Sequence, residues 1–89
     1  MHAVIVAVTI NDAEKATENL RNEIVPQVKQ APGFVAGYWT RFDGGNQGRG
    51  VMVFESEDAA RTVAARLSDN PAEEVTLDSV DVGEVIESA

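Results

Sequence analysis

The sequence predicts a single α+β domain over residues 1–89, in the ferredoxin-like element order β-α-β-β-α-β. Short runs rich in β-branched and aromatic residues alternate with two stretches whose apolar residues recur at i+3 and i+4. A glycine-rich segment at 43–48 is typical of a hairpin connection between two strands. Right-handed crossovers then place two helices on one face of a four-stranded antiparallel sheet.

The first strand and the first helix are expected at residues 2–10 and 11–30. Both alternating faces of the strand are apolar, which indicates burial on both sides. Asn11 is the predicted helix cap, with Glu14 completing a capping box. The helix has one apolar stripe, formed by Ala13, Ala16, Leu20, Ile24 and Val28. Pro26 should kink this helix or end its regular stretch near Val25.

The second and third strands are expected at residues 34–42 and 49–55, antiparallel to each other. Alternation assigns three aromatic side chains of the second strand to one side, namely Phe34, Tyr38 and Phe42. It assigns Val35 and Trp39 to the other side. In the third strand, Met52 and Phe54 should oppose Val51 and Val53. Both strands therefore present apolar residues on both faces.

A second helix should begin after the cap residue Ser56 and end within the segment SDNP at 68–71. Its predicted apolar stripe consists of Ala60, Val63, Ala64 and Leu67. The last strand is expected at residues 75–86, with Val80, Val82 and Ile86 on one face. Asp78 falls on that same face, so this strand should be irregular or partly exposed.

The two-sided apolar strands predict a homodimer. Two helices cover only one sheet face, and soluble monomers rarely expose a large apolar patch. A chain of 89 residues without cysteine also builds only a modest core. We therefore expect a second copy to pack against the face that the helices leave open.

Composition argues against several classes of partner. The formal net charge is −8, and nucleic acids and anionic membranes both require a basic face. The longest apolar run, at 3–8, is too short to span a bilayer and lacks the features of a signal peptide. We expect a cytoplasmic protein that binds neither nucleic acid nor membrane.

Two segments carry a resemblance to a known family: APGFVAGYW at 31–39 and GVMVFESEDAARTVA at 50–64. In both, the chain resembles the dimeric α+β barrel superfamily, which includes antibiotic-biosynthesis monooxygenases, muconolactone isomerases and stress-responsive barrel proteins. The resemblance covers almost the whole chain. It implies a homodimer whose two sheets form a barrel, with a ligand cavity between sheet and helices or inside the barrel.

The chain departs from two functional patterns of this superfamily. Many monooxygenase members carry Glu-x-Trp at the end of the third strand, where this chain has Met52 and Phe54. Haem-degrading relatives use a histidine on the second helix, and the second helix expected here contains none. No cofactor is therefore expected, and Met52 and Phe54 are counted as candidate ligand-binding residues.

The segment FVAGYWTR supplies the other candidate ligand-binding residues. Trp39 and Arg41 share one side of the strand and offer stacking together with charge-assisted hydrogen bonding; Tyr38 lies on the other side. The alternative is that these aromatic residues are core or interface anchors. Gly37, beside Ala36, lies where a filled strand would carry bulk, so it marks either a gap for a ligand or a close backbone approach.

His2 is the remaining candidate, with a binding role or an inert place at a strand end as alternatives. One histidine cannot build a metal site, so no metal is expected. The sequence favours a protein that binds a small apolar or aromatic molecule without catalysing a reaction. The alternative is a cofactor-independent monooxygenase or isomerase acting on an aromatic or polyketide-like substrate. Its acid or base would come from Tyr38, His2, Glu55 or Asp78, with Arg41 stabilising an anion.

Overall fold

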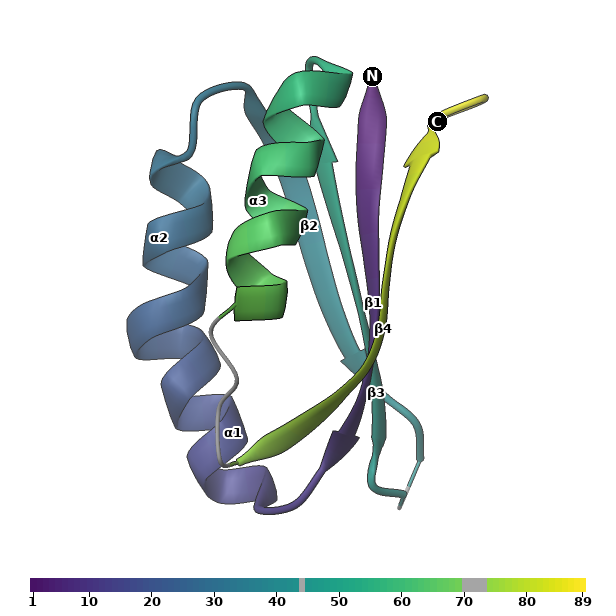
Figure 1. The fold of residues 1–89 in the computed structure, drawn as a ribbon. Helices are drawn as coiled ribbons and strands as arrows, with labels where there is room; N and C mark the ends of the chain where they lie inside the picture. The colour runs from purple at the N-terminus through teal and green to yellow at the C-terminus, as the bar shows by residue number, and fades with distance from the viewer. Residues whose placement is uncertain (44, 70–73) are drawn as a thin grey trace.

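The computed structural model describes residues 1–43, 45–69 and 74–89 and confirms the ferredoxin-like architecture (Figure 1). The strands are β1 (His2–Ile10), β2 (Phe34–Arg41), β3 (Gln47–Phe54) and β4 (Val75–Glu84). They form one antiparallel sheet in the order β2-β3-β1-β4. The helical segments, which all lie on one face of this sheet, are α1 (Ala13–Asn19), η1 (Leu20–Ile24), α2 (Val25–Gln30) and α3 (Glu57–Asp69).

The first helical run is continuous but contains a wide π-type turn, η1, between α1 and α2. The predicted cap at Asn11 is wrong by one residue, since the side chain of Asp12 accepts the Lys15 N–H at 3.1 Å. Within the wide turn the Val25 N–H bonds to the Leu20 carbonyl, five residues earlier. Pro26 follows at once and lacks an N–H, so the helix accommodates it by widening and continues to Gln30 rather than ending.

The second helix begins as predicted, with the Ala59 N–H bonding to Ser56 Oγ at 3.2 Å. Its predicted apolar stripe packs on the sheet, with Ala60 and Val63 buried. It ends at Asp69, and residues 70–71 of the predicted stop signal lie outside the described residues. No helix among the described segments has the length and apolar character needed to cross a bilayer.

A β-bulge reverses part of the predicted facing of β2. The pairing with β3 shifts between Phe34 and Ala36, so that Phe34 opposes Phe54 whereas Trp39 opposes Gly50. The extra residue places Phe34 and Trp39 on the helix-covered face together. Tyr38 alternates to the other face, so the prediction that Phe34 and Tyr38 share a side is wrong.

A second irregularity lies in β4, as the position of Asp78 predicted. The register with β1 shifts between Ala7 and Val8, which leaves Asp78 without a direct partner on β1. Its carboxylate accepts a hydrogen bond from Thr9 Oγ1 at 2.8 Å. The strand ends at Glu84, two residues earlier than expected, and Ile86 beyond it is 90% exposed rather than packed with the strand.

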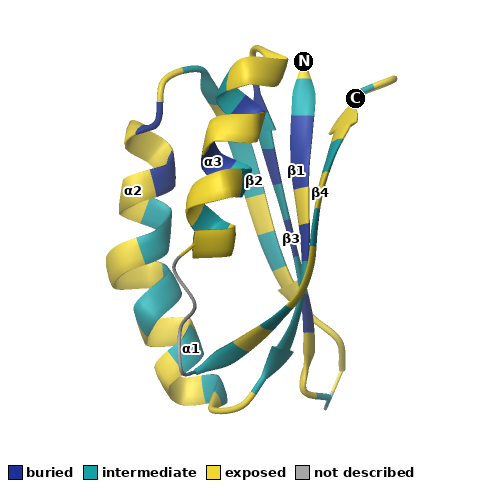
Figure 2. Ribbon diagram, viewed as in Figure 1, coloured by how far each residue is buried: buried dark blue, intermediate teal, exposed yellow. Residues whose placement is uncertain are grey.

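The hydrophobic core lies between the sheet and the helices (Figure 2). Its largest fully buried side chains are Phe54, Met52 and Val4. The Phe54 ring meets Phe34 edge to face, with centroids 5.8 Å apart and planes at 72°. This packing fixes the upper half of the sheet in Figure 1 against α2 and α3.

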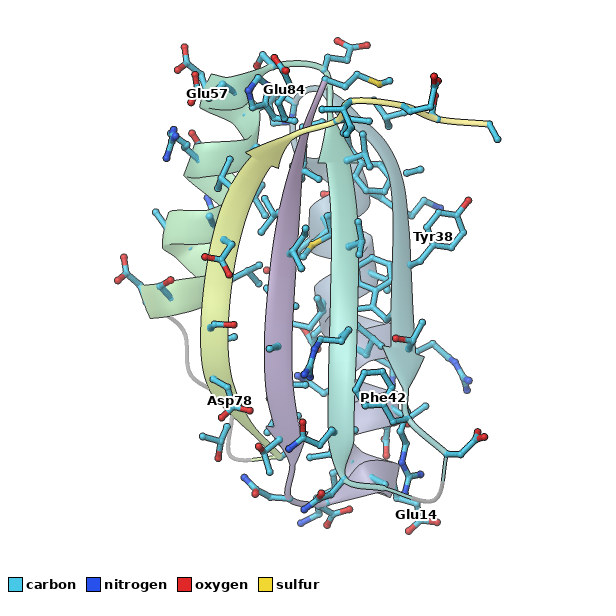
Figure 3. The ribbon with its side chains drawn as sticks, turned by 90° about the vertical axis from the view of Figure 1, so that its right-hand side faces the viewer. Glu14, Tyr38, Phe42, Glu57, Asp78 and Glu84 are labelled. Atoms are coloured by element: carbon cyan, nitrogen blue, oxygen red, sulfur yellow. The ribbon has the colours of Figure 1, made fainter. Side chains whose placement is uncertain are left out.

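The opposite sheet face is free of helices (Figure 3). We call it the open face and define it by five side chains: Ile5, Tyr38, Phe42, Val51 and Val53. Tyr38 is 69% exposed and Phe42 is 50% exposed. The open-face side chains of β1, β2 and β3 confirm that these three strands carry apolar residues on both sides.

Candidate functional site

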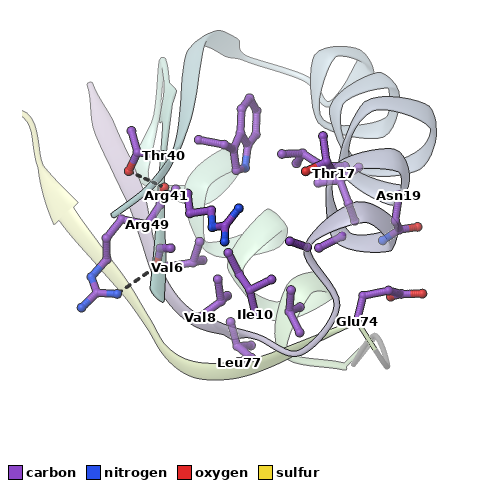
Figure 4. Close-up of a pocket in the computed structure, with 18 of the residues that line it drawn as sticks. Val6, Val8, Ile10, Thr17, Asn19, Thr40, Arg41, Arg49, Glu74 and Leu77 are labelled. Carbon is purple, nitrogen blue, oxygen red and sulfur yellow. Dashed lines mark hydrogen bonds between the residues drawn. The ribbon is translucent and has the colours of Figure 1, made fainter. Parts of the chain in front are cut away.

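A cavity of about 320 Å³ lies between the helix-covered sheet face and the α1–η1 segment (Figure 4). The strands contribute apolar side chains to its wall, mainly Val6, Val8, Ile10, Met52 and Leu77. The helical wall contains the first four residues of the predicted apolar stripe, Ala13, Ala16, Leu20 and Ile24. This stripe therefore borders an open space, whereas Val28 further along the same stripe is buried in the core.

Two glycines of β3 belong to the cavity wall, and neighbouring groups pack directly against the strand there. Gly48 and Gly50 lie on the same face of the strand, opposite Val8 and Val6 of β1. A side chain at Gly48 would meet the Thr40 carbonyl at 3.1 Å and Val8 at 3.2 Å. Sequence reasoning missed these residues because it assigned Gly48 to the hairpin loop. The detectable signal was the spacing G-x-G, which places both glycines on one face of a strand.

Trp39 is held against the sheet by two glycines. A Cβ at Gly37 would lie 2.7 Å from Cη2 of the indole, and one at Gly50 would lie 2.9 Å from its Cδ1. Both distances are shorter than any real carbon contact, so only glycine permits this position of the ring. The prediction of a gap for a ligand at Gly37 is wrong, since the indole fills that space. The alternative of a close backbone approach is not observed either, because the nearest neighbours of Gly37 are the side chains of Trp39 and Phe34, and Gly37 does not have a positive φ.

The polar groups of the cavity are few. Arg41 points its guanidinium into the cavity, whereas the guanidinium of Arg49 points away and lies over the Phe42 ring at 5.0 Å (Figure 4). Arg41 Nε donates a hydrogen bond to the Gly45 carbonyl at 2.8 Å. Glu74 is the one carboxylate among the described lining residues, and its backbone carbonyl accepts the Asn11 N–H at 2.7 Å.

Three of the predicted ligand-binding residues line this cavity: Trp39, Arg41 and Met52. Gly37 lies directly beneath Trp39 and shapes the cavity through it. Phe54, two residues beyond Met52 on the same face, is fully buried in the core and does not line the cavity.

Tyr38 and His2 lie away from the cavity. Tyr38 is on the open face, and His2 is at the start of β1, whereas Val6, Val8 and Ile10 of its second half line the cavity. A hydrogen bond from Arg61 lowers the pKa of Glu57, and the charges of Arg61 and His2 act in the same direction. The exposed Arg61–Glu57 ion pair, with Nη2 and Oε2 2.7 Å apart, lies at the start of α3. Among the described residues, no three His, Cys, Asp or Glu side chains gather as a metal ion requires.

Solved structures with the same fold include three differently described proteins. A mutant of MhuD, with two manganese protoporphyrin IX molecules bound per active site, is 20% identical and has a TM-score of 0.69 over 100% of this chain and 98% of that one. HapK from Hahella chejuensis is 13% identical, with a TM-score of 0.68 over 100% and 96%. The monooxygenase ActVA-Orf6 of Streptomyces coelicolor, in complex with nanaomycin D, is 16% identical, with a TM-score of 0.61 over 98% and 92%.

These likenesses confirm the fold that the family resemblance predicted. MhuD from Mycobacterium tuberculosis is also described as a heme-degrader, at 19% identity and a TM-score of 0.54. No protein-family model and no curated protein sequence matches the chain. At these identities a shared fold does not imply a shared reaction, so function has to be argued from the cavity itself.

Proposed function

We propose that this protein binds a small apolar or aromatic molecule in the cavity between the sheet and α1–η1. The observation that carries the proposal is the cavity wall, in which apolar side chains surround a fixed indole and a single inward-pointing guanidinium. Its volume of about 320 Å³ lies in the range of small-molecule sites, ~300–1,000 Å³. Neighbours of the same fold that are described with bound porphyrin or nanaomycin D support a small-molecule ligand.

The chain carries its own reporter for a binding experiment. Trp39 is the single tryptophan, and it lines the cavity, so a ligand that enters should change its fluorescence. The neutral fluorophore N-phenylnaphthylamine is a suitable probe because it requires no charged partner. We expect saturable binding, with energy transfer from Trp39 to the probe.

A cavity-filling variant tests the location. Ala16→Phe projects a ring from α1 into the cavity and should abolish probe binding. Ala65→Phe is the matched control, because Ala65 is exposed on α3 and away from this cavity. Circular dichroism on both variants verifies the fold. Probe binding that is unchanged in a folded Ala16→Phe protein would place the ligand elsewhere and refute the proposal.

We further propose that the protein is a homodimer through the open face. Ile5, Tyr38 and Phe42 expose apolar surface together on this face, as interface residues do in the free chain. The cavity opens on the opposite side of the sheet, so a partner on the open face leaves it accessible.

A second candidate function is a cofactor-independent monooxygenase or isomerase. It is favoured by the likeness to a monooxygenase and by Glu74, a carboxylate at the cavity that can act as a general base. Oxygen uptake with hydroxynaphthalene substrates tests it, and Glu74→Gln should abolish the uptake. Uptake that persists in this variant would exclude Glu74 as the base.

Haem does not fit the cavity residues, although MhuD is described with it. Proteins hold haem iron through His, Cys, Met or Tyr. Among the described lining residues only Met52 is of these types, and it is 1% exposed within the core. The proposed function therefore involves no haem.

A further inference from the structure

Arg41 reaches the cavity because of its place on β2. Its cross-strand partner is Gly48, which has no side chain to occupy the same face. The guanidinium therefore extends over β3 into the space between the sheet and α1 (Figure 4). It lies two residues beyond Trp39 on the same face, so the cation and the indole belong to one wall.

The hydrogen bond of Arg41 leaves one side of its guanidinium available. Nε donates to the Gly45 carbonyl at 2.8 Å, which fixes the orientation of the group. Among the described residues, no carboxylate forms an ion pair with Arg41. The two Nη atoms therefore remain as an end-on pair of donors, the geometry that a carboxylate accepts with two parallel hydrogen bonds.

The charged groups around the cavity favour an anion at the end where Arg41 lies. The chain has a net charge of −8, so an anionic ligand would be repelled unless a local cation held it. Arg41 is the one cation that points into the cavity among the described lining residues, and Glu74 lies at the helix side, away from it. An anion is thus favoured beside Arg41 and disfavoured near Glu74, which sets the direction of a ligand with one charged end.

We infer that the ligand is an aromatic carboxylate, with its carboxylate on the Nη atoms of Arg41 and its ring body beside Trp39 in the apolar part of the cavity. This inference rests on the proposed function and adds the chemical class and the orientation. Arg41 acts as the residue that selects carboxylates, and Trp39 forms the surface that accepts the ring.

The test compares naphthoate with its uncharged isostere naphthamide, each measured by displacement of N-phenylnaphthylamine. In the wild-type protein we expect naphthoate to bind about 10- to 100-fold more tightly, as a charge-assisted pair of hydrogen bonds predicts. Arg41→Gln should remove this preference and leave naphthamide binding unchanged. Arg41→Lys should retain only a fraction of it, since lysine cannot form the two parallel bonds.

Arg21→Gln is the matched control, because Arg21 is exposed on η1, does not line the cavity, and changes the net charge by the same amount. It should keep the full preference for naphthoate. Equal affinity for the two compounds in the wild-type protein, or a preference that survives Arg41→Gln, overturns the inference while probe binding upholds the proposed function. Failure of the probe to bind overturns both.

Discussion

The two faces of the sheet differ in what covers their apolar side chains. The face under the helices is covered but incompletely filled, since a cavity of about 320 Å³ remains beneath α1 and η1. The open face has no cover, yet Val51 follows directly after Gly50 on β3 and joins a continuous apolar surface. The same strand thus carries glycines beneath closely packed neighbours on one side and valine side chains on the other. The difference indicates a ligand for the first face and a protein partner for the second.

The largest expected effect compares a phenylalanine on each face. Phe54→Ala removes a fully buried ring and should lower the free energy of unfolding by about 3–5 kcal/mol. Phe42→Ala removes a half-exposed ring and should act mainly through the partner chain, so its effect should fade on dilution. Urea unfolding at two protein concentrations measures both. Equal, concentration-independent losses would show that the faces do not differ in this way.

The next prediction concerns a substitution that should disrupt the proposed interface on the open face and leave the cavity unchanged. Ile5→Lys places a charge at the centre of the proposed interface, whereas Asp81 directly across on β4 can pair with it in the separated chain. At micromolar concentration, light scattering should give twice the chain mass for the wild-type protein and the single mass for the variant.

Gln27→Lys supplies the control for that experiment, since it adds the same charge on the exposed side of α2. It should remain dimeric, and Ile5→Lys should still bind N-phenylnaphthylamine in the separate cavity. A wild-type protein that is already a folded monomer would remove the reason for assigning the open face to a partner.

Sequence reasoning reached the fold because the signals that decide it are local. The strand runs, the helix stripes and the Ser56 cap each follow from residues within one element. The facing of β2 did not follow, because the bulge after Phe34 depends on pairing with a strand distant in the chain. The bulge adds one residue, so Trp39 rather than Tyr38 shares a sheet face with Phe34. A period-two pattern read from the sequence alone gives the opposite assignment.

The candidate site was only partly predicted for the same reason. Trp39 and Arg41 were found together because their i, i+2 spacing is local to one strand. Glu74 was missed because it reaches the cavity only through the sheet order and the return of β4. Whether Tyr38 or His2 binds any ligand remains a prediction, and both lie outside the cavity.

A smaller effect on stability is expected when valine substitutions are compared at two glycines, Gly37 beneath the Trp39 indole and Gly83 on β4. Gly37→Val must displace the Trp39 indole and should cost about 1–3 kcal/mol by overpacking, with a shifted Trp39 emission and weaker probe binding. Gly83→Val is the matched control on β4, where an added Cβ meets nothing within 4 Å. It should leave stability unchanged or slightly higher, as valine favours strands. Equal melting temperatures for the two variants would refute the role given to Gly37.

The smallest expected effect concerns Pro26 in the helical wall of the covered face. Proline inside a helix ordinarily costs ~3 kcal/mol, but here the preceding wide turn already accommodates the missing N–H. Pro26→Ala gains a donor and loses the benefit of a stiffer unfolded chain, about 0.4–1 kcal/mol, so the net change in stability should stay below about 1 kcal/mol.

The same variant examines whether the wide turn shapes the cavity. Leu20 and Ile24 lie in η1 and line the cavity, so their positions depend on this turn. If packing against the sheet holds the turn, Pro26→Ala should keep both the dimer mass and the affinity for N-phenylnaphthylamine. A loss of probe binding with an unchanged melting temperature would instead show that Pro26 itself maintains the turn. In that case the cavity would depend on Pro26 through the positions of Leu20 and Ile24.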